Sequence, residues 1–305
     1  MRALVTGGAG FIGSHLVDAL VAAGHDVVVV DDLSRGRREH VPDGADLVVL
    51  DICDTALGDV VAQAAPEVVF HEAAQIDVRS SVRDPLADAG TNVVGTVNVL
   101  SACAGAGVRR VVFASTGGAI YGDTEVIPTP ETQPCAPESP YGTGKLCAEA
   151  YGGTFQRIKG LEFVALRYAN VYGPRQDPHG EAGVVAIFAT RLHRGEPCVI
   201  NGAGTQTRDY VYVGDVVAAN LQALTVTSPA VFNIGTGVET DVNELYARLR
   251  AIAGSSHHAE HGPGKPGEQR RSALDVSLAR DGLRWQPAVD LDTGLRRTFD
   301  FFGGS

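Results

Sequence analysis

The chain of 305 residues lacks the features of several protein classes. It contains no run of about 18 apolar residues, the length that a membrane-spanning helix requires. Its first residues, Met1-Arg2-Ala3-Leu4-Val5-Thr6-Gly7, are typical of a strand and turn rather than of a signal peptide. Positive charge is also scarce, because 25 basic residues stand against 36 acidic ones, a net charge of −11 that opposes nucleic-acid binding. We therefore expect a cytoplasmic protein that binds neither nucleic acid nor membrane.

Paired cysteines and metal-ligand clusters are missing as well. The five cysteines are odd in number and form no C-x-x-C pair, which favours free thiols in a reducing compartment. Three imidazoles gather at His257, His258 and His261, but they lack a helical frame and a second cluster of ligands. The sequence therefore predicts a solvated loop at these histidines and no metal site.

Hydrophobic residues make up 44% of the chain, enough for a sizeable core, and the length suits two domains or one large one. In the first half, short β-branched runs alternate with longer helical segments. The four valines at 27–30 show no polar alternation, which suits a parallel sheet covered on both faces. These patterns predict an α/β protein with a Rossmann-type doubly wound parallel sheet. Strands are expected at 2–6, 26–30, 46–50, 68–71, 110–114 and 162–166, and helices at 11–23, 55–64, 85–106 and 141–159.

The pattern loosens after about residue 170, where loops rich in Pro, Gly and Asp appear. We expect residues 1–169 to form the sheet domain and 170–305 a smaller α/β domain over the carboxyl ends of the strands. The strand-like segments 210–213 and 231–234 suggest that 208–236 return to the first domain. Helices are expected at 183–194, 215–224, 241–253 and 291–302.

A glycine-rich turn follows the first expected strand. In Thr6-Gly7-Gly8-Ala9-Gly10-Phe11-Ile12-Gly13, Gly7 and Gly10 allow a tight turn and a close approach of the backbone to a pyrophosphate, and Gly13 allows close packing of helix on sheet. The N–H groups at the start of the helix, around Phe11 and Ile12, then face the anion. A purely structural turn is the alternative.

Carboxylates at the end of the second strand favour the dinucleotide interpretation. Asp31 lies 18 residues after Gly13, where it can accept both hydroxyls of an adenine ribose. A 2′-phosphate would meet both Asp31 and Asp32, so NAD is preferred over NADP. We place Ser34 in the same cofactor-binding set.

The segment Tyr141-Gly142-Thr143-Gly144-Lys145 puts a phenol and an ammonium group on one helix face. The ordinary pKa of tyrosine, about 10, is too high for a base near neutrality. The cation of Lys145, together with the positive ring of NAD⁺, is expected to lower the pKa of Tyr141. Thr116, at the end of the fifth strand, is positioned to hydrogen-bond the substrate oxygen that exchanges the proton. A surface Tyr–Lys pair and a plain strand-end turn are the structural alternatives.

Together these residues resemble the extended short-chain dehydrogenase/reductase family and, within it, the nucleotide-sugar epimerases. The resemblance covers nearly the whole chain. It includes the glycine-rich turn, H-x-A-A at 71–74, S-T-G-G-A-I-Y-G at 115–122, Y-G-T-G-K at 141–145, R-Y-A-N-V-Y-G-P at 167–174, R-D-Y-V-Y-V at 208–213 and N-I-G-T-G at 233–237.

The resemblance implies a role for further residues in the two parts, a NAD-binding domain and a nucleotide-sugar-binding domain. Near the adenine and along the cofactor it implies Asp51, Ile52, Ala73 and Ala74; near the active site, Asn92 and Tyr168; and on the diphosphate of the sugar nucleotide, Asn170 and Arg208. The implied activity is NAD-dependent 4-epimerisation of a UDP-hexose, by transient oxidation at C4, rotation of the 4-keto sugar and hydride return. The family's helix bundle also implies a homodimer.

Among the departures of the chain from the family pattern, two concern charged residues of the site. Gly117 and Gly118 occupy the positions where dehydratases carry an Asp-Glu pair, which disfavours a 4,6-dehydratase. The late R-x-G-D motif is replaced by a segment in which Lys265 and Glu268 take the substrate-binding positions, without bidentate geometry at the lysine. The alternatives are a nucleotide-sugar oxidoreductase or decarboxylase, an epimerase of another UDP- or dTDP-sugar, and a non-catalytic NAD-binding regulator.

Overall fold

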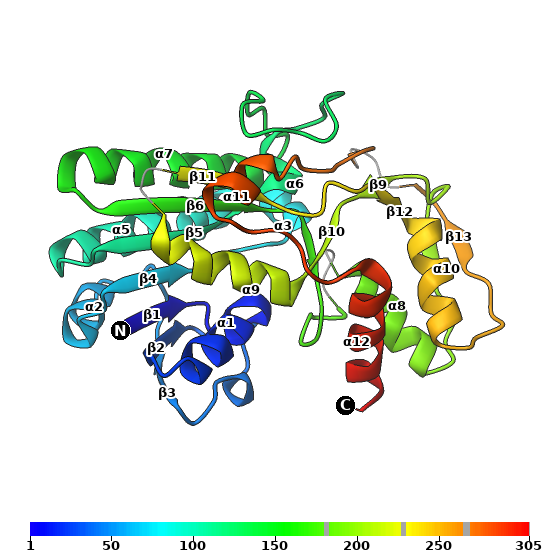
Figure 1. Ribbon diagram of the computed structural model, residues 1–305, viewed down its shortest axis with the longest axis horizontal. Coiled ribbons are helices and arrows are strands. Elements are labelled where there is room, and N and C mark those ends of the chain that lie inside the picture. Colours follow the sequence, from blue (N-terminus) through cyan, green and yellow to red (C-terminus); the bar gives the residue numbers. More distant parts are fainter. Residues whose placement is uncertain (180–182, 227–229, 265–268, 305) are drawn as a thin grey trace.

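The computed structural model describes residues 1–179, 183–226, 230–264 and 269–304. Seven parallel strands form its central sheet, in the order β11-β6-β5-β4-β1-β2-β3 (Figure 1). The predicted fold class, a doubly wound parallel sheet, is confirmed. The strands are β1 (Arg2–Thr6), β2 (Asp26–Asp31), β3 (Ala45–Val49), β4 (Val68–His71), β5 (Arg110–Thr116), β6 (Glu162–Tyr168) and β11 (Ala230–Ile234).

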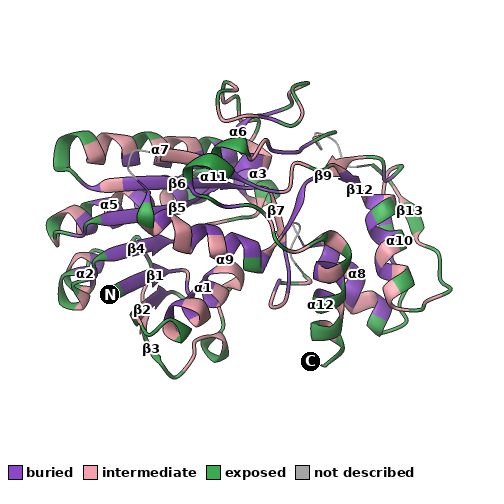
Figure 2. Ribbon diagram, in the orientation of Figure 1, coloured by how far each residue is buried: buried purple, intermediate pink, exposed green. Residues whose placement is uncertain are grey.

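Both faces of the sheet are buried, which is why its strands are apolar without alternation. In β1, Ala3 and Val5 join the core on one face, and Leu4 joins the core on the other. Helices α1 (Phe11–Ala22) and α9 (Val213–Gln222) cover the first face. Helices α2 (Leu57–Ala64), α5 (Thr96–Gly105) and α7 (Pro140–Lys159) cover the second. Figure 2 shows the buried strands between these layers.

The helix expected at 85–106 is broken into three parts: α4 (Pro85–Ala89), a π-helical turn η2 (Gly90–Gly95) and α5. Asp84 begins α4 by accepting the N–H of Ala87, and Pro85 suits the first turn because it needs no donor. A short helix that was not expected, α3 (Val78–Arg83), precedes it and is capped by Asp77. These short elements bring residues 75–92 against α7.

A smaller group of elements follows β6 and lies to one side of the sheet (Figure 1). Helices α8 (Val184–His193), α10 (Val242–Ile252) and α12 (Leu291–Gly303) share a separate core. Beside them, β8 (Val199–Asn201) pairs with β13 (Glu260–Gly262), so His261 belongs to a short strand rather than to the expected loop.

Two short strand pairs connect this group to the sheet. Strand β7 (Asn170–Tyr172) pairs with β10 (Tyr210–Tyr212), and β9 (Thr207–Arg208) pairs with β12 (Thr240–Asp241). The chain then re-enters the sheet as β11. The other short elements are η1 (Arg38–His40), α6 (Gly117–Ile120), η3 (Ala223–Thr225) and α11 (Ser277–Gly282). Among the described residues, no helix is both long and apolar enough to span a bilayer.

Candidate active site

The carboxyl ends of the parallel strands carry most of the expected site residues at one edge of the sheet. The glycine-rich turn follows β1, Asp31 ends β2, residues 72–74 follow β4, and Thr116 and Tyr168 end β5 and β6. Parallel sheets bind ligands beyond this edge because helix N-termini and loops meet there. The topology therefore brings together residues that lie up to 160 positions apart in the sequence.

The glycine-rich turn is too crowded for side chains. Gly7 has a positive φ of 71°, and its N–H donates to Val30 O at 2.8 Å. A Cβ at Gly7 would lie 2.6 Å from Ala73 N, and one at Gly13 would lie 2.2 Å from Gly7 O. Helix α1 begins after Gly10 without a side-chain cap. A backbone cradle at an uncapped helix N-terminus fits the pyrophosphate of a dinucleotide.

Asp31 joins this turn to the end of β2. Its Oδ2 accepts the N–H of Ala9 at 2.9 Å, and its Oδ1 accepts the N–H of Leu33 at 2.9 Å. Burial raises the pKa of the Asp31 carboxyl, although both backbone bonds lower it. Each oxygen keeps a further lone pair for a ribose hydroxyl. Its neighbour Asp32 accepts both the N–H and the hydroxyl of Ser34.

The other residues expected near the adenine follow β3. Asp51 accepts the N–H of Cys53 at 2.8 Å and is exposed. Ile52 is buried, and a Cβ at Gly95 of η2 would come within 2.8 Å of its side chain. The turn after β3 is therefore held against η2 at the same edge of the sheet.

A buried histidine at the end of β4 connects β1 to α5. His71 Nδ1 lies 2.7 Å from Thr6 Oγ1, and its Nε2 lies 3.0 Å from Thr96 Oγ1. Because the Thr96 hydroxyl donates to Asn92 O, it accepts from Nε2, which leaves Nδ1 to accept from Thr6. The imidazole is therefore neutral, and burial, aided by the charge of Lys145, lowers the pKa of His71 to about 3.

Asn92 lies on the π-helical turn and fixes the segment after β4. Its amide exchanges hydrogen bonds with the backbone of Gln75, at 3.0 Å and 2.9 Å, and donates to Asp88 Oδ1 at 2.9 Å. Ala73 N donates to Thr6 Oγ1 at 3.4 Å, so Ala73 lies directly beside the glycine-rich turn, and Ala74 follows it. Hydrogen bonds thus connect the segments whose residues were expected to lie along the cofactor.

Tyr141, Lys145 and Thr116 meet where α7 crosses the end of β5. Ser139 begins α7 by accepting the N–H of Gly142 at 3.1 Å, which places Tyr141 in the first turn. The Thr116 hydroxyl is hydrogen-bonded to the Tyr141 phenol. Lys145 Nζ, one turn further on, donates to Ala114 O at 2.8 Å and lies 4.8 Å from the centre of the Phe113 ring.

The lowering of the Tyr141 pKa that was expected from Lys145 and NAD⁺ together stays a prediction, because the structure gives the pKa of the protein without NAD⁺. Burial raises the pKa of Tyr141 to about 12, with the charge of Asp88 adding to the rise and the Thr116 hydrogen bond opposing it. Burial also lowers the pKa of Lys145 to about 8, against the charges of Glu72, Asp88 and Glu149. The protein side chains therefore do not create a phenolate unaided.

A buried ion pair supports the strand end next to these groups. Glu149 of α7 accepts two bonds from Arg167 of β6, at 3.0 Å and 2.7 Å, and one from the Ser115 hydroxyl at 2.6 Å. Both charged side chains are less than a tenth exposed. This network ties α7 to β5 and β6, so the phenol of Tyr141 and the hydroxyl of Thr116 are held by rigid elements.

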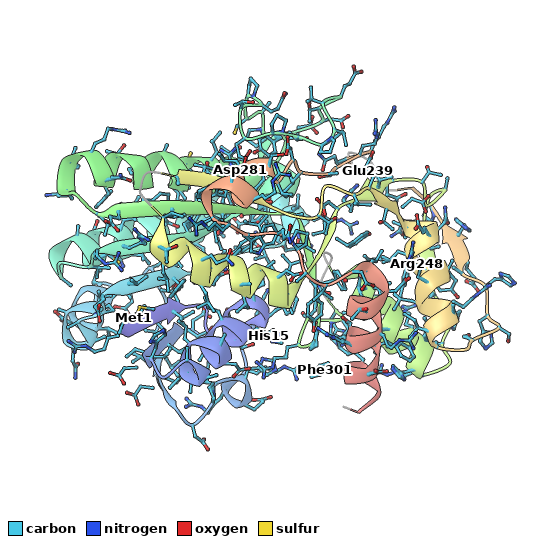
Figure 3. The ribbon with its side chains drawn as sticks, viewed as in Figure 1. Met1, His15, Glu239, Arg248, Asp281 and Phe301 are labelled. Atoms are coloured by element: carbon cyan, nitrogen blue, oxygen red, sulfur yellow. The ribbon has the colours of Figure 1, made fainter. Side chains whose placement is uncertain are left out.

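Asn170 of β7 lies beside the residue that follows Arg208 of β9 and close to Gly118 of α6. Asn170 N donates to Asp209 O at 2.9 Å, and a Cβ at Gly118 would lie 3.7 Å from Asn170 Oδ1. The guanidinium of Arg208 donates to Thr207 O at 2.7 Å. Thr207 in turn bonds Glu239, which also pairs with Arg271; Glu239 is labelled in Figure 3. Lys265 and Glu268 lie outside the described residues.

Residues 3–235 match the model of the NAD dependent epimerase/dehydratase family, which is more than half of the chain. The chain belongs to this family. Family membership makes the protein NAD-dependent and agrees with the resemblance inferred from the motifs. It also accounts for the dinucleotide cradle and for the Tyr141–Lys145 pair above it.

Similar proteins from the family match along their full length. The UDP-glucose 4-epimerase of Mycolicibacterium smegmatis is 49% identical, over 99% of this chain and 98% of its own. The UDP-glucose 4-epimerase of Thermotoga maritima, solved with UDP-glucose, has a TM-score of 0.97 at 49% identity and covers 99% of this chain and 98% of its own. That of Thermus thermophilus, solved with NAD, has a TM-score of 0.95 at 44% identity and covers both chains completely.

Sequence reasoning missed one acidic group in this site. Glu72, directly after β4, accepts the hydroxyl of Tyr168 at 2.9 Å. The only signal was the acidic residue inside the H-x-A-A motif, and its partner on β6 is 96 residues away.

Proposed function

We propose that the protein is a nucleotide-sugar 4-epimerase that interconverts UDP-glucose and UDP-galactose. The observation that carries this proposal is the joining of Tyr141, Lys145 and Thr116 at the end of β5, with Gly117 and Gly118 in place of acidic residues. Full-length relatives of 44–49% identity bear this activity in their names, which supports the same assignment. The absence of an acidic residue at positions 117 and 118, directly after Thr116, disfavours elimination of water from the sugar.

Tyr141 holds the proton of the sugar's 4-hydroxyl in this proposal, and Thr116 orients that hydroxyl. Bound NAD⁺ would supply the hydride acceptor for C4 and, once reduced, the hydride donor for the opposite face of the sugar. Because burial holds the pKa of Tyr141 at about 12 in the protein alone, the positive ring of NAD⁺ has to supply much of the stabilisation of the phenolate. Lys145, fixed to Ala114 O, adds a second positive charge on the same side of the helix.

The remaining residues divide between the two ligands. We propose that the glycine-rich turn binds the pyrophosphate and that the residues after β2 and β3 bind the adenosine. Asn170 and Arg208 would hold the sugar-nucleotide diphosphate, since the planar guanidinium matches phosphate oxygens. In this proposal residues 1–169 form the NAD-binding domain, to which residues 208–236 return. Residues 170–305 form the smaller domain that binds the sugar nucleotide. The proposed cofactor set comprises Gly7, Gly10, Phe11, Ile12, Gly13, Asp31, Asp32, Ser34, Asp51, Ile52, Ala73, Ala74, Asn92, Tyr141, Lys145 and Tyr168; Lys265 and Glu268 stay proposed substrate residues.

We further propose a homodimer in the cytoplasm. Helices α3, α4 and α7 and the turn η2 pack on one another and leave large apolar side chains exposed. They include Val82, Leu86, Val94 and Ile158, of which Leu86 is 85% exposed. Such apolar surface on neighbouring elements favours a protein contact. All five cysteines are free thiols, which suits a reducing compartment. Light scattering of wild type and Leu86→Asp tests the dimer; a monomeric wild type would contradict it.

The test of the activity is a panel of UDP- and dTDP-sugars, with C4 inversion followed by proton NMR. We expect inversion of UDP-glucose and UDP-galactose without net release of NADH. Stoichiometric NADH release would support the oxidoreductase or decarboxylase instead. Cofactor binding without turnover of any sugar would support the regulator. Tyr141→Phe is the inactive reference, and Tyr151→Phe, on the exposed surface of the same helix, is its matched control.

A further inference from the structure

Glu72 is an acidic residue at the cofactor end of the site to which the proposed mechanism gives no task. Its backbone N–H donates to Thr6 O at 3.1 Å, which fixes it beside the glycine-rich turn. Its Oε1 accepts the hydroxyl of Tyr168 at 2.9 Å. The carboxyl group therefore stands at the end of β4, between the cofactor cradle and the end of β6.

The direction of the Tyr168 hydrogen bond is determined by a third residue. Asn220 of α9, fully buried, donates its Nδ2 to the Tyr168 hydroxyl at 2.7 Å and to Val216 O at 3.0 Å. The bond to a carbonyl identifies this atom as the amide nitrogen, which can only donate. The Tyr168 hydroxyl is thus occupied as an acceptor, and its own proton is directed to Glu72.

The titratable groups around Glu72 come from four elements: α7, α4, β4 and β6. Lys145 of α7 acts on Glu72 with its positive charge, and Asp88 of α4 and Glu149 of α7 act on Lys145. His71, next to Glu72 on β4, is neutral, and Tyr168 of β6 is protonated because burial raises its pKa. Burial raises the pKa of Glu72 to about 7, with Tyr168 and Lys145 opposing the rise. The charge of this carboxyl group therefore changes near neutral pH.

We propose that Glu72 is a positioning residue that sets, through Tyr168 and Lys145, the preference of the site for oxidised over reduced NAD. NAD⁺ carries a positive charge on its nicotinamide ring and NADH does not. An ionised Glu72 attracts that charge and favours NAD⁺, whereas a protonated Glu72 favours NADH. Exchange of one form for the other is then linked to one proton on Glu72, taken from or released to water, in addition to the proton held by Tyr141.

The experiment compares Glu72→Gln with Glu67→Gln. The amide keeps an oxygen for the Tyr168 hydroxyl but does not titrate. Glu67 lies at the opposite end of β4 and is exposed, so the control makes the same chemical change away from the site. Each holoprotein is equilibrated with NAD⁺/NADH mixtures of set ratio from about pH 6 to 8.5 and then desalted. Absorbance near 340 nm gives the reduced share of the bound cofactor.

We expect wild type and Glu67→Gln to bind NADH progressively less well, relative to NAD⁺, as the pH rises through about 7. Glu72→Gln should lose this dependence. It should exceed wild type in the NADH-to-NAD⁺ binding ratio by about tenfold at pH 8.5, the equivalent of one pKa unit, and converge with it at pH 6. Tyr168→Phe removes a hydrogen bond that lowers the pKa of Glu72, so it should move the midpoint to higher pH.

An equal offset between Glu72→Gln and wild type at all pH values would overturn the proposal, because a purely structural effect has no reason to vanish in acid. The absence of any difference would overturn it too. The measurement uses NAD⁺ and NADH only. Failure of the protein to epimerise UDP-glucose would therefore contradict the proposed function and leave this result standing on its own.

Discussion

The two ends of the candidate site are built from different materials. The dinucleotide end is mostly backbone: an uncapped helix N-terminus and glycines such as Gly7 and Gly13, where an added Cβ would lie 2.6 Å and 2.2 Å from neighbouring backbone atoms. The proposed sugar end consists of side chains, Asn170 and above all Arg208, carried by strands of three and two residues. Steric exclusion makes the first end intolerant of change, whereas side chains at the second can be exchanged at moderate cost. We infer that the cofactor choice is rigid and that the substrate choice is adjustable.

The largest effect is expected where the two ends meet. Replacing Tyr141 by Phe removes the group proposed to exchange the proton, and turnover should fall about 10²–10⁴-fold, the usual contribution of general acid–base catalysis. Bound NAD should stay at wild-type stoichiometry, because the glycine-rich turn is unchanged. Steady-state rates and the absorbance of the bound cofactor provide the measurement. Turnover near that of Tyr151→Phe would refute the role of Tyr141.

The next largest effect is expected at the dinucleotide end, in the glycine-rich turn. Gly13→Ala places a Cβ 2.2 Å from Gly7 O. Because this neighbour is a backbone atom, it cannot move aside as a flexible side chain could. We expect loss of bound NAD and a decrease of about 1–3 kcal/mol in the free energy of unfolding. Gly58→Ala is the matched control, because nothing lies within 4 Å of its added Cβ in α2. Calorimetry and cofactor content measure both; normal NAD content in Gly13→Ala would contradict the comparison.

A smaller effect is expected at the side-chain end. Arg208→Lys keeps the positive charge and loses the planar fork that binds two phosphate oxygens. The KM for the UDP-sugar should rise about tenfold, while kcat and bound NAD change little. Arg157→Lys, on the exposed surface of α7, serves as the control. A loss of bound NAD in Arg208→Lys would show that the two ends are not independent.

The smallest effect concerns the pH dependence of the free energy of unfolding and involves the buried side chain of His71. His71 has a pKa of about 3 in the folded protein and about 6.5 when unfolded. Below pH 6.5 the unfolded chain therefore binds one more proton, so this part of the stability is fully present above pH 6.5 and is lost as the pH falls. The slope is about 1.4 kcal/mol per pH unit at most. Urea unfolding at several pH values between about 5 and 6.5 gives the free energy of unfolding at each pH. This free energy should fall less steeply with decreasing pH in His71→Gln than in wild type.

Sequence reasoning succeeded where burial and backbone geometry leave a local pattern. The bounds of β1 and β4 agree residue for residue with the expected ones, because apolar β-branched runs end at glycine or polar residues there. The glycine-rich turn was found because only glycine fits it. Short strands such as β9 were missed, since two residues carry no periodicity. The π-helical turn was missed because apolar spacing does not reveal a change of hydrogen-bond register.

The electrostatics of the site could not be predicted in the same way. The pKa of Tyr141 depends on its burial and on Asp88, which lies 53 positions earlier in the chain. The sequence shows the proximity of Lys145, one turn away, but not the depth of the phenol. For the same reason the partner of Glu72 was invisible, since only the pairing of β6 into the sheet brings Tyr168 to it.

The burial of Lys145 has a practical consequence for chemical labelling. Lysine is scarce in this chain, occurring only at positions 145, 159 and 265, and Lys145 is 3% exposed while Lys159 is exposed on the same helix. An amine-reactive dye therefore reaches Lys159, as well as the α-amino group of Met1, and spares Lys145. At 1.5 Å per residue, the 14 positions between them place the dye roughly 21 Å from Lys145 along a rigid rod. In a Lys265→Arg variant, energy transfer from fluorescent NADH to the dye on Lys159 would measure a distance along this helix.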